Sequence, residues 1–133
     1  MQIMGVRILI VDDSALFRQG VCGVIKANLD WGVCGEAADG LEGIQKNREL
    51  VPHLIIMDLA MPRMNGIEAA IQILKEFPDV PILLLTLYIS HQLVEDARNV
   101  GIRATLSKTA MHDLPDAIHA VLRGKDFNAA IPC

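Results

Sequence analysis

Three aspartates stand at the ends of two short apolar runs. Asp12 and Asp13 follow "ILIV" (8–11), and Asp58 follows "LIIM" (54–57) and precedes a segment rich in turn-forming residues. Carboxylates that are held close together repel one another, and burial raises their pKa values unless a cation intervenes. Hard oxygen ligands with no His or Cys nearby suit Mg²⁺, a metal that often works beside phosphate. The spacing therefore indicates a candidate site for Mg²⁺ and phosphate chemistry.

A hydroxyl and an ammonium group follow two later apolar runs. Thr86 ends "ILLLT" and Lys108 follows "ATLS". A carboxylate beside a bound metal can attack phosphorus and form an acyl phosphate. Lys108 would then neutralise one phosphoryl oxygen, and Thr86 would donate a hydrogen bond to another. Because Asp58 is expected to lie centrally, it is the candidate nucleophile, and Asp12 and Asp13 are the candidate metal-holding pair.

Each of these residues alone also has a structural explanation. An Asp after an apolar strand is commonly a turn or helix-cap residue, and Asp12-Asp13-Ser14 is a good helix start. Thr86 suits a strand by its propensity, and a lysine such as Lys108 is usually solvated at the surface. Their shared placement after four different apolar runs favours a common site over coincidence.

The apolar runs alternate with segments of helical periodicity along the chain. The predicted strands are 7–11, 33–37, 53–57, 82–85 and 103–107. The predicted helices begin near Ser14, Asp39, Asn65, Ser90 and Asp113, and the fourth of them ends at Gly101. This pattern predicts an α/β fold: a doubly wound, five-stranded parallel sheet of flavodoxin-like order 2-1-3-4-5, with helices on both faces. Ligands of such sheets bind at the carboxyl ends of the strands, where all five candidate residues are expected.

Composition narrows the class of protein. The chain has 133 residues, 52% of them hydrophobic, which suits one packed domain. A net charge of −4 gives no indication of the basic surface by which proteins bind nucleic acid. The three cysteines are not spaced as the ligands of a metal site usually are. We expect them to be reduced thiols in a cytoplasmic protein. No secretory signal is visible, and no apolar run approaches the roughly 20 residues of a membrane helix, so no membrane contact is expected.

Four motifs in this order resemble the receiver domains of two-component response regulators: "VDDS" (11–14), "MDLAMPRMNG" (57–66), "LLLT" (83–86) and "LSK" (106–108). The resemblance covers about residues 6–124. It implies transfer of a phosphoryl group from a sensor histidine kinase, or from small phosphodonors, onto an aspartate in the presence of Mg²⁺. It also implies autodephosphorylation rather than conventional enzymatic turnover.

Carried over residue by residue, the resemblance makes Asp58 the phosphoacceptor, assisted by Thr86 and Lys108. Asp13 and Asp58 would bind Mg²⁺ directly, Asp12 would bind it largely through water, and the backbone carbonyl of Ala60 would be a further ligand. Met61-Pro62 would stiffen the loop beyond Asp58, and Asn65-Gly66 would start the next helix.

Other segments resemble a particular branch of the family. Many receivers carry Pro after the lysine, where this chain has Thr109. That variant, with "PRMNGIEA" (62–69) and "DLPDAIHAVLRGK" (113–125), resembles receivers that precede a LuxR/NarL-type helix-turn-helix domain. We therefore expect a receiver over 1–126 and the start of a linker or tail over 127–133, in the regulatory part of a transcriptional regulator. It would contact DNA only through a C-terminal domain absent from this chain. A stand-alone receiver acting through protein contacts is the alternative.

A second difference from the usual receiver sequence concerns how the domain would pass on its signal. Receivers usually carry an aromatic switch residue three positions before the lysine, where this chain has Thr105. We expect output to depend on Thr86 and the following loop, with Tyr88 supplying the missing ring. Self-association through the face of the fourth and fifth helices, giving a phosphorylation-dependent homodimer, is the expected readout.

Two rival classes use the same kind of sheet. A flavodoxin-like cofactor binder would want a Ser/Thr/Gly phosphate loop where this chain has Asp12 and Asp13. A Mg²⁺-dependent phosphohydrolase with an Asp nucleophile would need a cap or long insertions, and the loops here are short. A flavin spectrum would favour the first, and steady turnover of small phosphate esters would favour the second.

Overall fold

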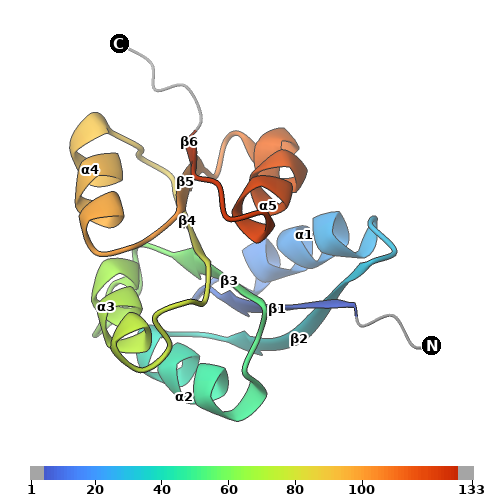
Figure 1. Ribbon diagram of the computed structural model, residues 1–133, viewed down its shortest axis with the longest axis horizontal. Helices are drawn as coiled ribbons and strands as arrows, with labels where there is room; N and C mark the ends of the chain where they lie inside the picture. Colours follow the sequence, from blue (N-terminus) through green and yellow to red (C-terminus); the bar gives the residue numbers. More distant parts are fainter. Residues whose placement is uncertain (1–4, 129–133) are drawn as a thin grey trace.

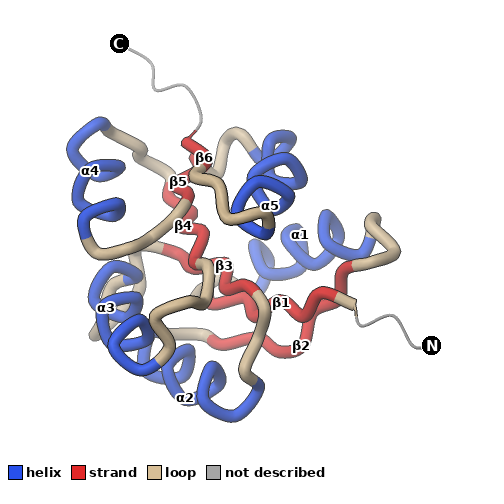
Figure 2. The backbone as a smooth tube through the Cα atoms, viewed as in Figure 1, coloured by secondary structure: helices blue, strands red, loops and turns tan. Residues whose placement is uncertain are grey.

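A computed structural model describes residues 5–128 of the chain, which form one parallel sheet with helices on both faces (Figures 1 and 2). The strand order is β2-β1-β3-β4-β5-β6. The strands are β1 (Val6–Val11), β2 (Trp31–Ala37), β3 (Leu54–Asp58), β4 (Ile82–Thr86), β5 (Ala104–Ser107) and β6 (Phe127–Asn128). The helices are α1 (Ala15–Lys26), α2 (Gly40–Leu50), α3 (Gly66–Glu76), α4 (His91–Asn99) and α5 (Leu114–Leu122), with a 3₁₀ turn over Met111–Asp113.

The predicted parallel sheet and the order of its first five strands are confirmed, but the prediction of five strands was wrong. A sixth strand, β6, pairs with the outer edge of β5. The backbone N–H of Phe127 donates to the carbonyl of Arg103 at 3.1 Å. Two residues are too few to show a period in the sequence, and the linker predicted from the sequence therefore includes this segment. Residues 129–133 of that predicted linker lie outside the described residues.

Side chains on the two faces of the sheet form two apolar cores. Ile8 and Ile10 of β1 face a core shared with α1 and α5. Leu9 and Val11 face the other core, which α2, α3 and α4 cover. Figure 1 shows α1 and α5 on one side of the sheet and the other three helices on the opposite side. Burial on both faces explains why the strands are apolar at nearly every position. It is complete in β3, an inner strand of the sheet, where every residue is buried.

Four of the predicted helix starts are confirmed as N-caps. The side chains of Ser14, Asp39, Asn65 and Ser90 each accept a hydrogen bond from the backbone N–H three residues later. Asn65 and Glu68 also form a complete capping box, whereas Glu42 accepts from the backbone N–H of Ala38, the residue before Asp39. These caps begin the helices soon after the strands end, so the carboxyl edge of the sheet stays open.

Within residues 5–128, none of the helices combines the length and hydrophobicity that crossing a bilayer would need.

Candidate functional site

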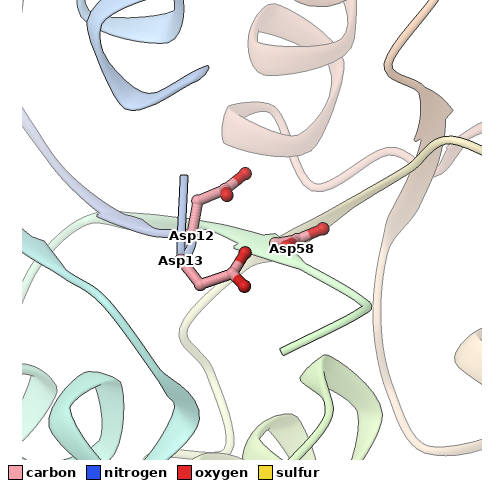
Figure 3. A group of neighbouring side chains, drawn as sticks. All are labelled: Asp12, Asp13 and Asp58. Atoms are coloured by element: carbon pink, nitrogen blue, oxygen red, sulfur yellow. The ribbon is translucent and has the colours of Figure 1, made fainter. Parts of the chain in front are cut away.

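The predicted site residues meet at the carboxyl edge of the sheet. Asp12 directly follows β1, and Lys108 directly follows β5. Asp58 and Thr86 are the last residues of β3 and β4. Figure 3 shows Asp12 and Asp13 at the end of β1 beside Asp58 on the neighbouring strand. One carboxylate oxygen from each of these three aspartates lies within 4.8 Å of the others. The structure thus brings together the three carboxylates that the sequence analysis selected.

Lys108 lies between two of the buried carboxylates. Its Nζ lies 2.9 Å from Oδ2 of Asp12 and 3.1 Å from Oδ1 of Asp58. These partners are only 2% and 4% exposed, whereas Asp13 is exposed. Asp12 is fixed further because its Oδ1 accepts a hydrogen bond of 2.8 Å from the backbone N–H of Ser14. The ammonium therefore holds together two carboxylates that would otherwise repel each other in a poorly solvated place.

Burial and charge shift the proton affinities of this cluster. Burial is the main cause that raises the pKa of Asp58 to about 6, the negative charge of Asp12 adds to it, and Lys108 partly opposes the change. Burial acts to lower the pKa of Lys108, but its hydrogen bonds and charge interactions with Asp12 and Asp58 outweigh burial and raise that pKa. At neutral pH the site therefore holds an ionised, unusually basic carboxylate beside a stable ammonium.

A cavity of about 560 Å³ opens over Asp58. Thr86 lies at its edge, and the hydroxyl oxygen of Thr86 accepts a hydrogen bond of 3.3 Å from the backbone N–H of Tyr88. The lining residues are Asp13, Ser14, Phe17, Asp58, Ala60, Thr86, Leu87, Tyr88 and Lys108. All the predicted site residues except Asp12 thus line one cavity, and Asp12 lies behind it, against Lys108.

The loop between β3 and α3 is packed tightly onto Asp58. Gly66, at the start of α3, donates its backbone N–H to the carbonyl of Leu59 at 2.8 Å. A Cβ atom on Gly66 would overlap the carbonyl oxygen of Asp58 and lie 3.0 Å from Cδ1 of Leu84. Arg63 adopts a left-handed φ of 66° and forms an ion pair with Asp39. The rigid turn predicted from Pro62 therefore also depends on a close backbone contact and on an ion pair.

Two side chains of α1 that the sequence analysis did not place in the site support it. The ring centre of Phe17 lies 4.2 Å from Nζ of Lys108. Arg18 donates from Nη1 to the backbone carbonyl of Asp12 and forms an ion pair with Glu36. Phe17, Val21 and Ile25 recur every four residues in the sequence, a spacing that indicates a core-facing side chain. The position of Phe17 in the first turn after the acidic pair is the one sequence signal of a second role.

Thr105 is buried on the face of the sheet that α3 and α4 cover. It lies opposite Leu84 of β4, and its backbone N–H donates to Oδ1 of Asn128 at 3.1 Å. Tyr88, expected to supply a replacement ring, is 87% exposed. In this conformation the ring of Tyr88 therefore lies outside the buried space beside Thr105.

The chain is similar in sequence to response regulators. The profile of the family described as "Response regulator receiver domain" matches residues 8–119. The "Response regulator protein VraR" of Staphylococcus aureus is 38% identical over 123 residues, which make up 92% of this chain and 59% of that protein. The chain thus spans about three fifths of the length of this curated relative.

Solved structures have the same fold. A two-component response regulator of the LuxR family from Aurantimonas superposes with a TM-score of 0.89 at 31% identity, covering 92% of this chain and 88% of that one. The isolated receiver domain of RcsB from Salmonella enterica serovar Typhimurium gives a TM-score of 0.86 at 27% identity, covering 93% of each chain. Since the family profile matches most of the chain and the acidic cluster lies where the fold binds ligands, the chain belongs to the response regulator receiver domain family.

Proposed function

We propose that Asp58 accepts a phosphoryl group from the phosphohistidine of a sensor histidine kinase, or from a small phosphodonor. The observation that carries this proposal is the position of Asp58 under an open cavity, 3.1 Å from the ammonium of Lys108. Thr86 lies on the neighbouring strand at the same edge. The RcsB receiver structure was determined in the presence of the phosphomimetic BeF₃⁻, which supports a phosphoryl site in a chain of this fold.

The proposed reaction is an in-line displacement at phosphorus. A carboxylate oxygen of Asp58 attacks the phosphorus, the bond to the leaving atom breaks, and the leaving group keeps the bonding electron pair. With its pKa near 6, Asp58 is ionised at neutral pH and more basic than an ordinary aspartate, so it is a better nucleophile. Lys108 compensates the charge of one phosphoryl oxygen, and the Thr86 hydroxyl donates to another.

The acidic cluster also fits Mg²⁺. Three carboxylates with oxygens within 4.8 Å form a hard donor set, and the exposed Asp13 stands at the cavity wall. We propose that Asp13 and Asp58 hold the ion directly, that Asp12 holds it through water, and that the backbone carbonyl of Ala60 completes the protein ligands. When bound, the ion would supply positive charge that offsets the carboxylates and the incoming phosphoryl oxygens.

Incubation with acetyl phosphate and Mg²⁺ is expected to add one phosphoryl group to the protein. Intact-mass measurement will follow the gain, and Asp58→Asn is expected to show none because an amide cannot form the acyl phosphate. Asp79→Asn is the matched control, since it removes an exposed carboxylate from the turn before β4. Undiminished labelling of Asp58→Asn would overturn the assignment of the phosphoacceptor.

Mg²⁺ is expected to stabilise the folded protein, because an ion that binds only the folded state shifts the unfolding equilibrium. The gain is about 3 kcal/mol at a hundredfold excess over Kd. Asp13→Ala should reduce the rise in thermal midpoint, whereas Asp79→Ala should respond to Mg²⁺ as the wild type does. Equal responses of the wild type and Asp13→Ala would exclude Asp13 as a ligand.

We further propose that this receiver regulates transcription through a DNA-binding domain that follows it in the complete protein. The similarity to VraR and to a LuxR-family regulator supports this. A cytoplasmic location and a phosphorylation-dependent homodimer belong to the same proposal. The coding sequence beyond Cys133 tests it: a basic helix-turn-helix domain would support it, and its absence would favour the stand-alone receiver.

A further inference from the structure

The ammonium of Lys108 is enclosed on three sides. Its Nζ donates a hydrogen bond to Oδ2 of Asp12 at 2.9 Å and forms an ion pair with Oδ1 of Asp58 at 3.1 Å. The ring centre of Phe17 lies 4.2 Å away. The Lys108 side chain is only 11% exposed, so little water competes for it. An ammonium carries three N–H donors. Asp12 accepts one of them and Asp58 lies within ion-pair distance of the ammonium, which leaves an N–H for a further acceptor in the cavity.

Hydrogen bonds connect the first turn of α1, which carries Phe17, to the loop that holds Asp12 and Asp13. Its backbone N–H donates to Oγ of Ser14 at 3.2 Å, which caps α1. Ser14 in turn donates its own N–H to Oδ1 of Asp12 at 2.8 Å. Arg18, the next residue, donates to the backbone carbonyl of Asp12. These bonds fix the first turn of α1 on Asp12, so the ring has a defined position relative to Lys108.

We propose that Phe17 is a positioning residue of the phosphorylation site, acting through Lys108. The negative face of the aromatic ring attracts the poorly solvated ammonium and keeps it beside Asp58. In that position the remaining N–H of Lys108 meets the phosphoryl group as charge develops on its oxygens. This inference rests on the proposed function, because the ring contributes only if Asp58 is phosphorylated.

The competing explanation is that Phe17 only fills space at the edge of the core, where it packs against the cluster covered by α1 and α5. An apolar side chain of similar size would then serve equally well. A role through the ring face instead requires an aromatic group. Phe17→Leu and Phe17→Met keep the apolar character without a ring, and Phe17→Tyr keeps the ring. Leu16→Ala is the matched control, since Leu16 is 79% exposed on the same turn.

The initial rate of phosphorylation by acetyl phosphate at saturating Mg²⁺ is expected to fall about fivefold in Phe17→Leu. This is the size of effect that loss of a partly desolvated cation–π contact produces. Phe17→Met should fall similarly, while Phe17→Tyr and Leu16→Ala should stay within about twofold of the wild type. A small donor is chosen because it needs no docking surface on α1. Intact-mass measurement over time gives the rates, and thermal midpoints confirm that each variant is folded.

A spectroscopic signature checks that the face of the Phe17 ring lies against the Lys108 side chain in solution, and the rates then separate positioning from packing. The ε-methylene protons of Lys108 are expected to be shifted upfield by the ring in the wild type and Phe17→Tyr, and to lose this shift in Phe17→Leu and Phe17→Met. Rates in Phe17→Leu and Phe17→Met equal to that of the wild type, or a Phe17→Tyr rate as low as that of Phe17→Leu, would overturn the inference and leave the phosphoacceptor intact. A wild type that gains no phosphoryl group would overturn the proposed function itself.

Discussion

Replacing Gly66 by alanine is expected to lower the free energy of unfolding by about 3 kcal/mol, at the upper end of the usual cost of overpacking. The added Cβ would overlap the carbonyl oxygen of Asp58 and press on Leu84 of β4. Neither neighbour can move freely, because β3 and β4 are buried on both faces and Asp58 is paired with Lys108. The strain would therefore shift the start of α3 and the backbone of the proposed phosphoacceptor together.

Gly23→Ala supplies the control with the opposite sign. Gly23 lies within α1, and a Cβ there meets nothing within 4 Å. Alanine in an open helix interior is expected to stabilise by about 0.5–1 kcal/mol. Urea unfolding of the two variants and the wild type gives both values. A Gly66→Ala variant as stable as the wild type would show that α3 can move away from β3, contrary to the packing described above.

The sequence was sufficient to predict the positions of the site residues. Each of them follows an apolar run, and parallel strands bring their carboxyl ends to one edge. Asp58, Thr86 and Lys108 could therefore be grouped without coordinates. The N-caps were also predictable, because Ser14 and Asn65 act through hydrogen bonds within three residues of themselves. Local chemistry and strand order together account for this success.

Contacts between distant elements could not be predicted in this way. Phe17 meets Lys108 across 91 positions of sequence, and its helical spacing indicates only that it faces the core. The need for glycine at position 66 arises from the backbone of Asp58 and a side chain of β4, which no local pattern encodes. The strand Phe127–Asn128 is held by hydrogen bonds to the edge of β5 rather than by its own periodicity. Each miss depends on a tertiary contact.

The electrostatics of Asp58 lead to a prediction about stability and pH in the absence of Mg²⁺. Folding raises the pKa of Asp58 from its ordinary value of 3.8 to about 6, chiefly through burial, so the folded state binds this proton more tightly than the unfolded state. Stability therefore falls as the pH rises from about 4 to about 6. Above that window, the ionised and buried Asp58 carries a cost that a neutral side chain avoids.

Asp58→Asn is consequently expected to be more stable than the wild type at pH 7.5 in EDTA. A pKa change of this size corresponds to about 3 kcal/mol if fully realised. Screening by solvent at the mouth of the cavity reduces the expected difference to about 1–2 kcal/mol. At pH 4 to 4.5 most of the advantage should be gone, because the wild-type carboxyl group is then protonated in the folded state and the amide gains little over it.

Urea unfolding of both proteins at pH 4.5 and pH 7.5 measures the difference, and Asp79→Asn controls for the loss of one negative charge at the opposite end of the strands. Mg²⁺ should reverse the order at pH 7.5, since it stabilises the wild type through a carboxylate that Asp58→Asn lacks. A variant equal to the wild type in EDTA at both pH values would mean that Lys108 fully compensates Asp58. The cluster would then hold no unfavourable charge for a metal ion to relieve.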